Sequence, residues 1–257
     1  MNLVDTHAHL FLDEFKNDLD EVVQRARDSG VSKVFLPNVD RSTFQRMMDI
    51  SERFENFCFP MIGLHPTSVK KNYLEELQHL ISFVDKYKFF AIGETGIDLY
   101  WDKTFFKEQQ DAFIRQIKLA KERRLPVIIH SRNSYNEIFE IMDEHHGDGL
   151  TGIFHSFTGN TEQASKIIDY GFMIGIGGIV TFKNSGLDRV VAEIPLESIV
   201  LETDSPYLSP VPRRGKRNEP SYLAHTAEKM AEIYQLPADE VARITTKNAL
   251  QLYSITE

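Results

Sequence analysis

The chain has 257 residues, of which 42% are hydrophobic, and its formal net charge is −9. This length suits one large α/β barrel as well as two small domains, and it is sufficient for a core that needs no disulfide or structural metal. The negative charge argues against tight, non-specific binding to a long polyanion, which requires a basic face, but it does not exclude a phosphate held at a local positive site.

Short apolar runs alternate with amphipathic stretches along the chain, and no linker or internal repeat interrupts them. We expect strands at residues 3–7, 33–37, 58–63, 89–93, 126–130, 152–155, 172–175 and 199–202. Helical segments follow them at residues 19–28, 42–54, 75–87, 105–124, 135–145, 162–170, 187–193 and 221–253. The expected strands are mostly apolar, which is typical of parallel strands covered on both faces. Eight such units favour a single α/β domain over residues 1–257, a (β/α)8 TIM barrel with C-terminal helices, and the alternative is an open doubly wound sheet.

The only cysteine, Cys58, has no partner for an intramolecular disulfide, so we expect a buried thiol and a reducing compartment. Neither a secretory signal nor an apolar run long enough to span a membrane is visible in the sequence. We therefore expect a cytoplasmic protein with no membrane partner. No large apolar surface segment stands out, which favours a monomer.

Ionisable side chains stand where the expected strands end. They are His7, His9, His65, Glu94, His130, His155 and Asp204. In a closed barrel the carboxyl ends of the strands converge on one mouth, where barrel enzymes place their active sites. Imidazole and carboxylate groups together bind zinc, manganese, iron and similar ions. Because the burial of so many polar groups without compensation is unfavourable, we predict a shared metal site at this mouth.

Each of these signals has a structural alternative when it is taken alone. His7 and His9 are spaced so that both rings lie on one side of a strand, with Asp5 on the same side as a supporting group, but such pairs also occur in ordinary cores. A histidine at a strand end commonly makes a structural hydrogen bond, and Glu94 also suits the N-terminus of a helix. The coincidence of many such groups at strand ends is what favours the metal site.

Basic residues in the loop after the eighth strand would face the same mouth. Guanidinium groups match the geometry of phosphate oxygens, so we interpret Arg213, Lys216 and Arg217 as a clamp for substrate phosphates, with Arg132 as a further candidate. The alternative is that this basic run is only a solvated loop.

Two further sets of residues near the mouth have open roles. His65 either contacts a phosphate or leaving oxygen, or makes a hydrogen bond that holds its own loop. The aromatic residues Tyr100, Trp101 and Phe157 either stack on a base of a single strand or pack at the barrel rim.

Seven segments of the chain, taken in order, resemble the motifs of the TatD deoxyribonuclease family. They are DTHAHL at residues 5–10, GLHP at 63–66, AIGETGID at 91–98, PVIIHSR at 126–132, HSFTG at 155–159, LETDSPYL at 201–208 and RRGKRNEP at 213–220. The one departure is Ile97, where leucine is commoner in the family. The motifs cover nearly the whole chain, and no ligand position of the family is missing.

The resemblance implies two divalent metal ions in an amidohydrolase-like barrel. His7, His9, Glu94 and Asp204 would hold one ion, and Glu94, His130 and His155 would hold the second. Relatives of the phosphotriesterase type bridge their metals with a carbamylated lysine, and the matching residue here is Glu94, which needs no modification. Mg²⁺ or Mn²⁺ is the expected ion in function. Because magnesium prefers oxygen ligands whereas this set is rich in histidine, Zn²⁺ is also compatible with the site.

Two cations held in this way would lower the pKa of a bridging water and bind a phosphoryl oxygen. We predict that Asp204 is the general base, because it can touch the metal and reach the water, and we count Glu94 and His65 among the catalytic residues. The expected activity is hydrolysis of DNA, as a 3′ to 5′ exonuclease on single strands. The alternative is a small-molecule hydrolase of an ester, amide or phosphotriester. A binding module without turnover would not require so many metal ligands.

Overall fold

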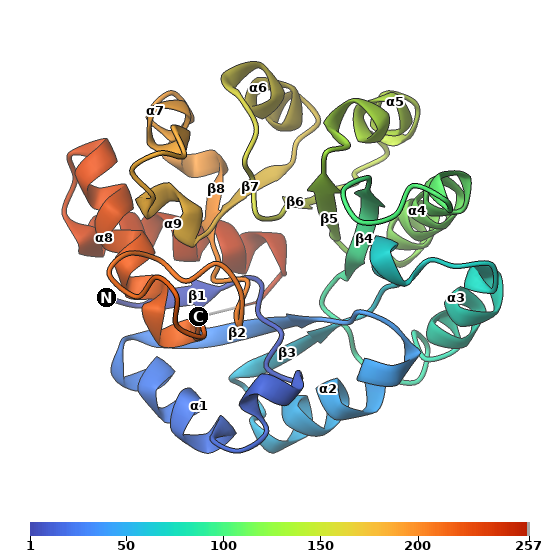
Figure 1. The fold of residues 1–257 in the computed structure, drawn as a ribbon, viewed down its shortest axis with the longest axis horizontal. Coiled ribbons are helices and arrows are strands. Elements are labelled where there is room, and N and C mark those ends of the chain that lie inside the picture. The colour runs from blue at the N-terminus through green and yellow to red at the C-terminus, as the bar shows by residue number, and fades with distance from the viewer. Residues whose placement is uncertain (256–257) are drawn as a thin grey trace.

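A computed structural model describes residues 1–255. Eight parallel strands alternate with helices, and the helices surround the strands (Figure 1). The strands are β1 (Leu3–Asp5), β2 (Val31–Pro37), β3 (Cys58–Met61), β4 (Ile92–Asp98), β5 (Val127–Arg132), β6 (Gly152–Phe154), β7 (Met173–Ile176) and β8 (Ile199–Leu201). The helices are α1 (Leu19–Asp28), α2 (Arg41–Arg53), α3 (Tyr73–Ile81), α4 (Phe106–Arg123), α5 (Tyr135–His145), α6 (Thr161–Asp169), α7 (Leu187–Val191), α8 (Leu223–Tyr234) and α9 (Ala238–Leu252).

The strands close into a ring across two seams. Hydrogen bonding orders them as β1-β2-β3 and as β4-β5-β6-β7-β8. A parallel bridge between Ile62 and Ile92 joins β3 to β4, and a second one between Ala8 and Ser205 joins the chain after β8 to the chain after β1. These contacts confirm the predicted (β/α)8 barrel and exclude the open sheet, whose first and last strands would lie far apart.

One layer of apolar side chains fills the interior of the barrel. It takes one residue from each strand or from its start, namely Val4, Phe35, Met61, Ala91, Ile128, Ile153, Met173 and Val200. Tyr253, which follows α9, stacks on Phe35 with ring centroids 3.7 Å apart. The C-terminal helix therefore covers this layer, and the interior is a packed core rather than a pore.

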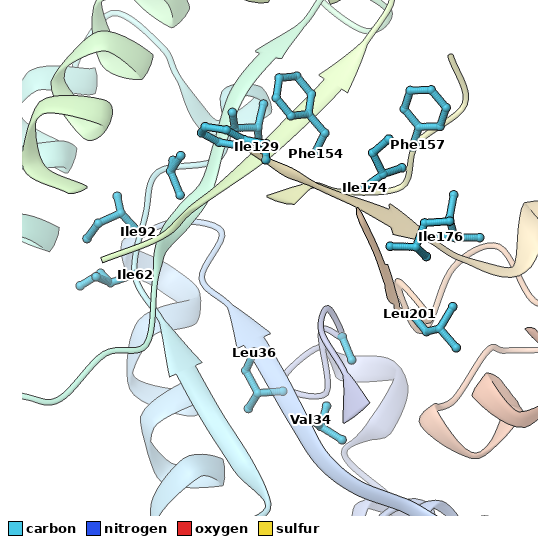
Figure 2. Packing of buried hydrophobic residues seen from close by; sticks show 14 of the residues in the cluster. Val34, Leu36, Ile62, Ile92, Ile129, Phe154, Phe157, Ile174, Ile176 and Leu201 are labelled. Carbon is cyan, nitrogen blue, oxygen red and sulfur yellow. The ribbon is translucent and has the colours of Figure 1, made fainter. Parts of the chain in front are cut away.

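A second and larger apolar layer lies between the strands and the helices. Its side chains come from successive strands around the barrel (Figure 2), and they include Val34, Leu36, Ile62, Ile92, Ile129, Phe154, Ile174, Ile176 and Leu201. Because neighbouring residues of a strand point to opposite faces, burial on both faces explains why the strands read as continuous apolar runs.

Three expected elements differ from the structure. The helix expected at residues 75–87 is α3, which ends at Ile81, and residues 82–86 form turns. The fourth strand was expected at residues 89–93 but occupies Ile92–Asp98, so Glu94 lies inside a strand whose seven residues are all buried. The polar residues of β4 can be buried because they have hydrogen-bond partners. For example, Gln116 donates a hydrogen bond to Thr95 over 2.6 Å. The expected helical segment at 221–253 consists of α8 and α9, which are separate because Pro237 lacks the amide hydrogen needed to continue a helix.

The single-domain prediction covers residues 1–257, and its last two residues lie outside the described part of the chain. Within residues 1–255, no helix combines the length and the apolar character that crossing a membrane requires. Cys58 is buried and has no disulfide partner, as expected for the only cysteine of the chain.

Candidate metal centre

The polar layer of the barrel begins directly above its apolar interior. His130 in β5, and His155 and Glu202 directly after β6 and β8, each follow an interior residue by two positions. These interior residues are Ile128, Ile153 and Val200, respectively. Since side chains alternate along a strand, these three polar groups point into the same interior, nearer the carboxyl ends of the strands. This is the end at which barrel enzymes place their active sites.

Glycines make room for this polar layer. A Cβ atom at Gly175 would lie 2.4 Å from Oε2 of Glu202 and 3.1 Å from Cα of His155, so β7 passes the layer without a side chain. A Cβ atom at Gly63 would lie 2.6 Å from the backbone of Gly93, which allows β3 and β4 to approach closely just before Glu94. These glycines therefore leave space in the mouth for the ionisable side chains.

Glu94 is the centre of the cluster and is 1% exposed. Its Oε1 lies 2.8 Å from Nδ1 of His130, 2.8 Å from Nε2 of His155 and 3.3 Å from Nε2 of His65. Its Oε2 lies 3.1 Å from Nε2 of His7 and 3.7 Å from Nε2 of His9. The two oxygens thus face two different groups of imidazoles.

Asp204 completes the group around His7 and His9. Its Oδ1 lies 3.8 Å from Nε2 of His7 and 3.5 Å from Nε2 of His9, and the two imidazole nitrogens lie 3.2 Å apart. Two ligand nitrogens that are each about 2.0–2.1 Å from a tetrahedral metal ion are about 3.3 Å apart. The spacing of His7 and His9 therefore suits a shared ion.

Unpartnered polar atoms test whether a metal ion fits this donor set. Among the described residues, several buried side-chain atoms of the cluster have no hydrogen-bond partner, namely His7 Nδ1, His9 Nδ1, Glu94 Oε2, His155 Nδ1 and Glu202 Oε2. Three sets of side chains place one donor atom each within 4.8 Å of one another: His7 with His155 and Asp204, His7 with His9 and Glu94, and His65 with Glu94 and His130. Glu94 Oε2 is the unpartnered atom that faces Nε2 of His7 and His9. Because buried polar atoms normally have partners, a cation shared by these atoms fits the residues present.

The electrostatics of the cluster also favour a cation. Burial alone would raise the pKa of Glu94, but attraction to His155, His65 and His7 outweighs burial and holds this pKa well below its ordinary value. Burial lowers the pKa of His7 and of His65, which favours the neutral imidazole that a metal ligand requires. Burial opposes charge on His155 too, yet Glu94 and Glu202 raise the pKa of its ring well above the usual range. The carboxylates therefore stabilise positive charge at the mouth of the barrel.

The backbone around Asp204 is held from several sides. Asp204 has a φ of +54°, in the left-handed region, and its amide donates to the carbonyl of His7 over 2.9 Å. The preceding residue, Thr203, donates its amide to Asp5 over 2.9 Å and accepts a hydrogen bond at its carbonyl from Asn218 over 2.8 Å. Strained backbone of this kind persists where the surroundings over-determine it, often at functional sites. The supporting role expected for Asp5 thus takes the form of a bond to Thr203, and burial raises the pKa of the Asp5 carboxyl to about 8.

Asp98 is a residue whose role the sequence analysis missed. Its Oδ2 lies 3.0 Å from Nε2 of His130, while Nδ1 of the same ring faces Glu94. Asp98 is itself fixed by Gln109, which accepts from its amide over 2.8 Å. A carboxylate on the far nitrogen of a metal-binding imidazole sets the tautomer and orientation of the ring. The position of Asp98 at the end of the AIGETGID segment was the available signal.

The basic residues expected to bind phosphate differ in their availability. Arg217 donates two hydrogen bonds of 2.7 Å to Asp18, which neutralises its charge within the chain. Arg213, Lys216 and Arg132 are exposed. Arg217 as a phosphate clamp therefore remains a prediction that competes with a structural role for this residue.

The aromatic residues near the mouth also divide into two kinds. Phe157 is 1% exposed and packs on Tyr135 with ring centroids 5.9 Å apart, so the idea that it stacks on a base is wrong. Tyr100 and Trp101 follow β4 and are 53% and 68% exposed, respectively, so they remain candidates for base stacking.

A groove of about 690 Å³ lies beside the metal cluster rather than over it. It is lined by Asp40, Arg41, Ser42, Thr67, Ser68, Lys70, Asn72 and Glu76. Its link to the cluster is Thr67, whose hydroxyl lies 2.6 Å from Nδ1 of His65. Polar side chains of both charges thus line the surface that leads away from the cluster.

A closed (β/α)8 barrel with histidines and carboxylates gathered at the carboxyl ends of its strands defines the class of barrel metallohydrolases. The family model described as TatD related DNase matches residues 4–254, and the chain belongs to this family. It is 41% identical over 254 residues to the uncharacterized metal-dependent hydrolase YabD of Bacillus subtilis, with 98% of this chain and 99% of YabD covered. The protein is a metal-dependent hydrolase of the TatD family.

Solved structures agree with this assignment. The crystal structure of YjjV, a TatD homolog from Escherichia coli, superimposes with a TM-score of 0.93 at 32% identity and covers 99% of this chain and 98% of its own. A hydrolase TatD family protein from Entamoeba histolytica gives a TM-score of 0.85 at 25% identity, with 100% of this chain and 99% of that protein covered.

Proposed function

We propose that this hydrolase cleaves phosphodiester bonds in DNA and removes nucleotides from the 3′ ends of single strands. The observation that carries the proposal is the arrangement around Glu94, whose two oxygens face two groups of imidazoles. His7, His9, Glu94 and Asp204 would hold one divalent cation, and Glu94, His130 and His155 the second. Bound cations would supply an acidified water and neutralise a phosphoryl oxygen.

Asp204 is suited to accept the proton of the attacking water. Burial opposes its charge, but a hydrogen bond with His9 and attraction to His155 and His7 hold the pKa of its carboxyl below the ordinary value. The side chain is therefore a carboxylate at neutral pH, and it is 14% exposed, so it can reach water at the mouth. A general base needs this combination of charge state and access.

His65 is placed between the metal cluster and the groove. Its Nε2 lies 3.3 Å from Glu94, and its Nδ1 bonds to Thr67, which lines the groove. We propose that His65 contacts the substrate phosphate where the strand leaves the cluster. His65→Asn should raise the KM for DNA and leave most of the metal content in place. A large loss of metal with little change in KM would make His65 a metal ligand instead.

Positive side chains along the mouth support a phosphate polymer as substrate. Arg41 and Lys70 line the groove, and Arg213, Lys216 and Arg132 are exposed at the loops that follow β8 and β5. Such groups bind phosphates without reading sequence. The name of the matching family, TatD related DNase, supports the same substrate class.

A small-molecule hydrolase is the second candidate. The observation that favours it is the pairing of Arg217 with Asp18, which removes one cation from the predicted phosphate clamp. A neutral ester or phosphotriester would not need that clamp.

The deciding experiment is hydrolysis of 5′-labelled single-stranded DNA by protein that has been stripped of metal and reloaded with Mg²⁺, Mn²⁺ or Zn²⁺. We expect a metal-dependent ladder that shortens from the 3′ end. Asp204→Asn should lower the rate by about 10²–10⁴-fold, the usual contribution of a general base, and Asp188→Asn, in α7, is the matched control. A folded, metal-loaded protein that cleaves esters or phosphotriesters but not DNA would replace this proposal with the second candidate.

We further propose that the protein acts as a monomer in the cytoplasm. The buried, unpaired Cys58 supports a reducing compartment. Light scattering of the purified protein would test the monomer directly.

A further inference from the structure

Two large aromatic side chains stand exposed side by side at the rim of the barrel. Tyr100 and Trp101 are 53% and 68% exposed, and their rings meet edge to face with centroids 4.9 Å apart. Single exposed aromatic residues are common on proteins, whereas an exposed contiguous apolar patch often marks a binding site.

Arg132, at the end of β5, joins this pair. Its guanidinium carbon lies 4.0 Å from the centroid of the Tyr100 ring and 5.3 Å from that of Trp101. One face of Tyr100 is therefore covered by the guanidinium, and Trp101 is the more exposed ring. We call these three residues the rim platform.

The rim platform is fixed to the metal cluster through Asp98. Oδ1 of Asp98 accepts hydrogen bonds from the backbone amides of Tyr100 over 2.9 Å and of Trp101 over 3.2 Å. Oδ2 of the same buried carboxylate lies 3.0 Å from Nε2 of His130. One side chain therefore sets both the orientation of a metal-binding imidazole and the backbone that carries the aromatic rings.

The loop that carries the two aromatic residues also contacts a residue of the groove beside the cluster. Lys70, which lines the groove, lies 3.4 Å from Asp102, the residue that follows Trp101. A strand whose phosphate is at the metal cluster could thus pass over the rim platform without leaving the protein surface.

We propose that the rim platform binds a nucleobase adjacent to the scissile phosphate, with Trp101 as the stacking face and Arg132 as its cationic partner. Aromatic rings with a nearby arginine are how single strands are held without sequence readout, because every base has a π-face. This inference rests on the proposed nuclease function and adds the part of the nucleotide that the metal cluster does not recognise.

The test uses Trp101 as its own reporter, because it is the only tryptophan of the chain. Metal-loaded protein is titrated with two phosphorothioate-linked, hydrolysis-resistant oligonucleotides of equal length, one carrying thymine bases and one abasic. We expect the thymidine strand to quench the tryptophan emission saturably and to bind about tenfold more tightly than the abasic strand, within the range of about 5- to 150-fold that one stacked base provides. The abasic strand should bind without quenching.

Two substitutions of Trp101 distinguish stacking by an aromatic ring from simple packing by a large apolar side chain. Trp101→Phe should keep most of the preference for the thymidine strand, whereas Trp101→Leu should lose it, as measured by anisotropy of labelled strands. Unchanged emission when the thymidine strand is bound, a preference that survives in Trp101→Leu, or no binding of either strand would overturn the platform. Base-dependent quenching without DNA hydrolysis would uphold the platform and refute the nuclease, while hydrolysis without quenching would do the opposite.

Discussion

Two clusters of ionisable residues in this molecule both contain carboxylates but have opposite character. The first is the metal cluster around Glu94, and the second is the ion-pair cluster of Asp18, Arg25, Arg217 and Glu219. In the ion-pair cluster, Arg217 donates two hydrogen bonds to Asp18, and Arg25 donates two to Glu219 over 2.8 and 2.6 Å. In the metal cluster, donor atoms converge on one another and several have no partner.

The difference lies in where the neutralising charge comes from. Arginine supplies the countercharge for Asp18 and Glu219, so this cluster is complete within the chain and ties the loop after β8 to α1. No arginine or lysine pairs with Glu94 or Asp204 in the described residues; their neighbours are imidazoles. Buried carboxylates that have only imidazoles as partners are stabilised by a bound cation, which is why the first cluster predicts a ligand and the second does not.

The largest effect should follow from removing the centre of the metal cluster. Glu94→Ala deletes the group that faces five histidines, so we expect metal content and DNA hydrolysis to fall by more than about 100-fold, beyond the loss typical of groups that only orient ligands. Metal analysis after gel filtration, together with the labelled-DNA assay, measures both quantities. Glu193→Ala, an exposed glutamate after α7, is the control, and full metal occupancy in Glu94→Ala would contradict the arrangement proposed here.

Asp98→Asn tests a carboxylate that lies outside the proposed ion sites but contacts His130, a proposed metal ligand. We expect a loss of about 10- to 100-fold in metal affinity or activity, since the orientation of His130 is no longer enforced. Competition with a chelator measures the affinity. Asp102→Asn, in the same loop but with its side chain 42% exposed, should leave the metal affinity unchanged, and equal effects of the two substitutions would remove Asp98 from the site.

The ion-pair cluster should respond to pH rather than to metal. Burial opposes the charge of Glu219, but the hydrogen bonds with Arg25 and Ser221 lower the pKa of its carboxyl below the ordinary value. Because this pKa is lower in the folded chain, its stabilisation is complete above the unfolded value of about 4.3 and is lost as the pH falls through the folded value.

Glu219→Gln should therefore lower the free energy of unfolding by about 1–2 kcal/mol at neutral pH, with a difference that shrinks in acid. Urea unfolding of the two proteins across a pH series measures this difference. A difference in unfolding free energy that stays constant at low pH would show that the charge of Glu219 contributes nothing to stability. Glu197→Gln, at an exposed glutamate, serves as the control.

The smallest effect should come from Arg217→Ala. If the pair with Asp18 is its main role, the free energy of unfolding falls by about 1 kcal/mol, as for other partly exposed ion pairs, and the KM for DNA stays the same. Lys216→Ala, at an exposed neighbour, should instead raise the KM without affecting stability. A raised KM in Arg217→Ala would break the comparison, because a member of the ion-pair cluster would then also bind substrate.

Much of the fold was predictable because parallel strands buried on both faces leave a simple trace in the sequence. The apolar runs located all eight strands, and only the fourth was displaced. That strand continues through Glu94 to Asp98, which a pattern of apolar residues cannot reveal, because its polar side chains are buried with partners such as Gln116 from α4. The break between α8 and α9 is predictable from Pro237, which cannot continue a helix.

The sequence by itself determined the type of chemistry, since histidines and carboxylates that recur at strand ends define a metal donor set wherever a barrel brings those ends together. Only the tertiary structure decided which charges are free to act. Asp18 lies 199 residues before Arg217 in the chain, yet the two side chains pair, and Asp98 reaches His130 from the neighbouring strand. Such contacts depend on the closure of the barrel and on side-chain direction, which local sequence patterns do not encode.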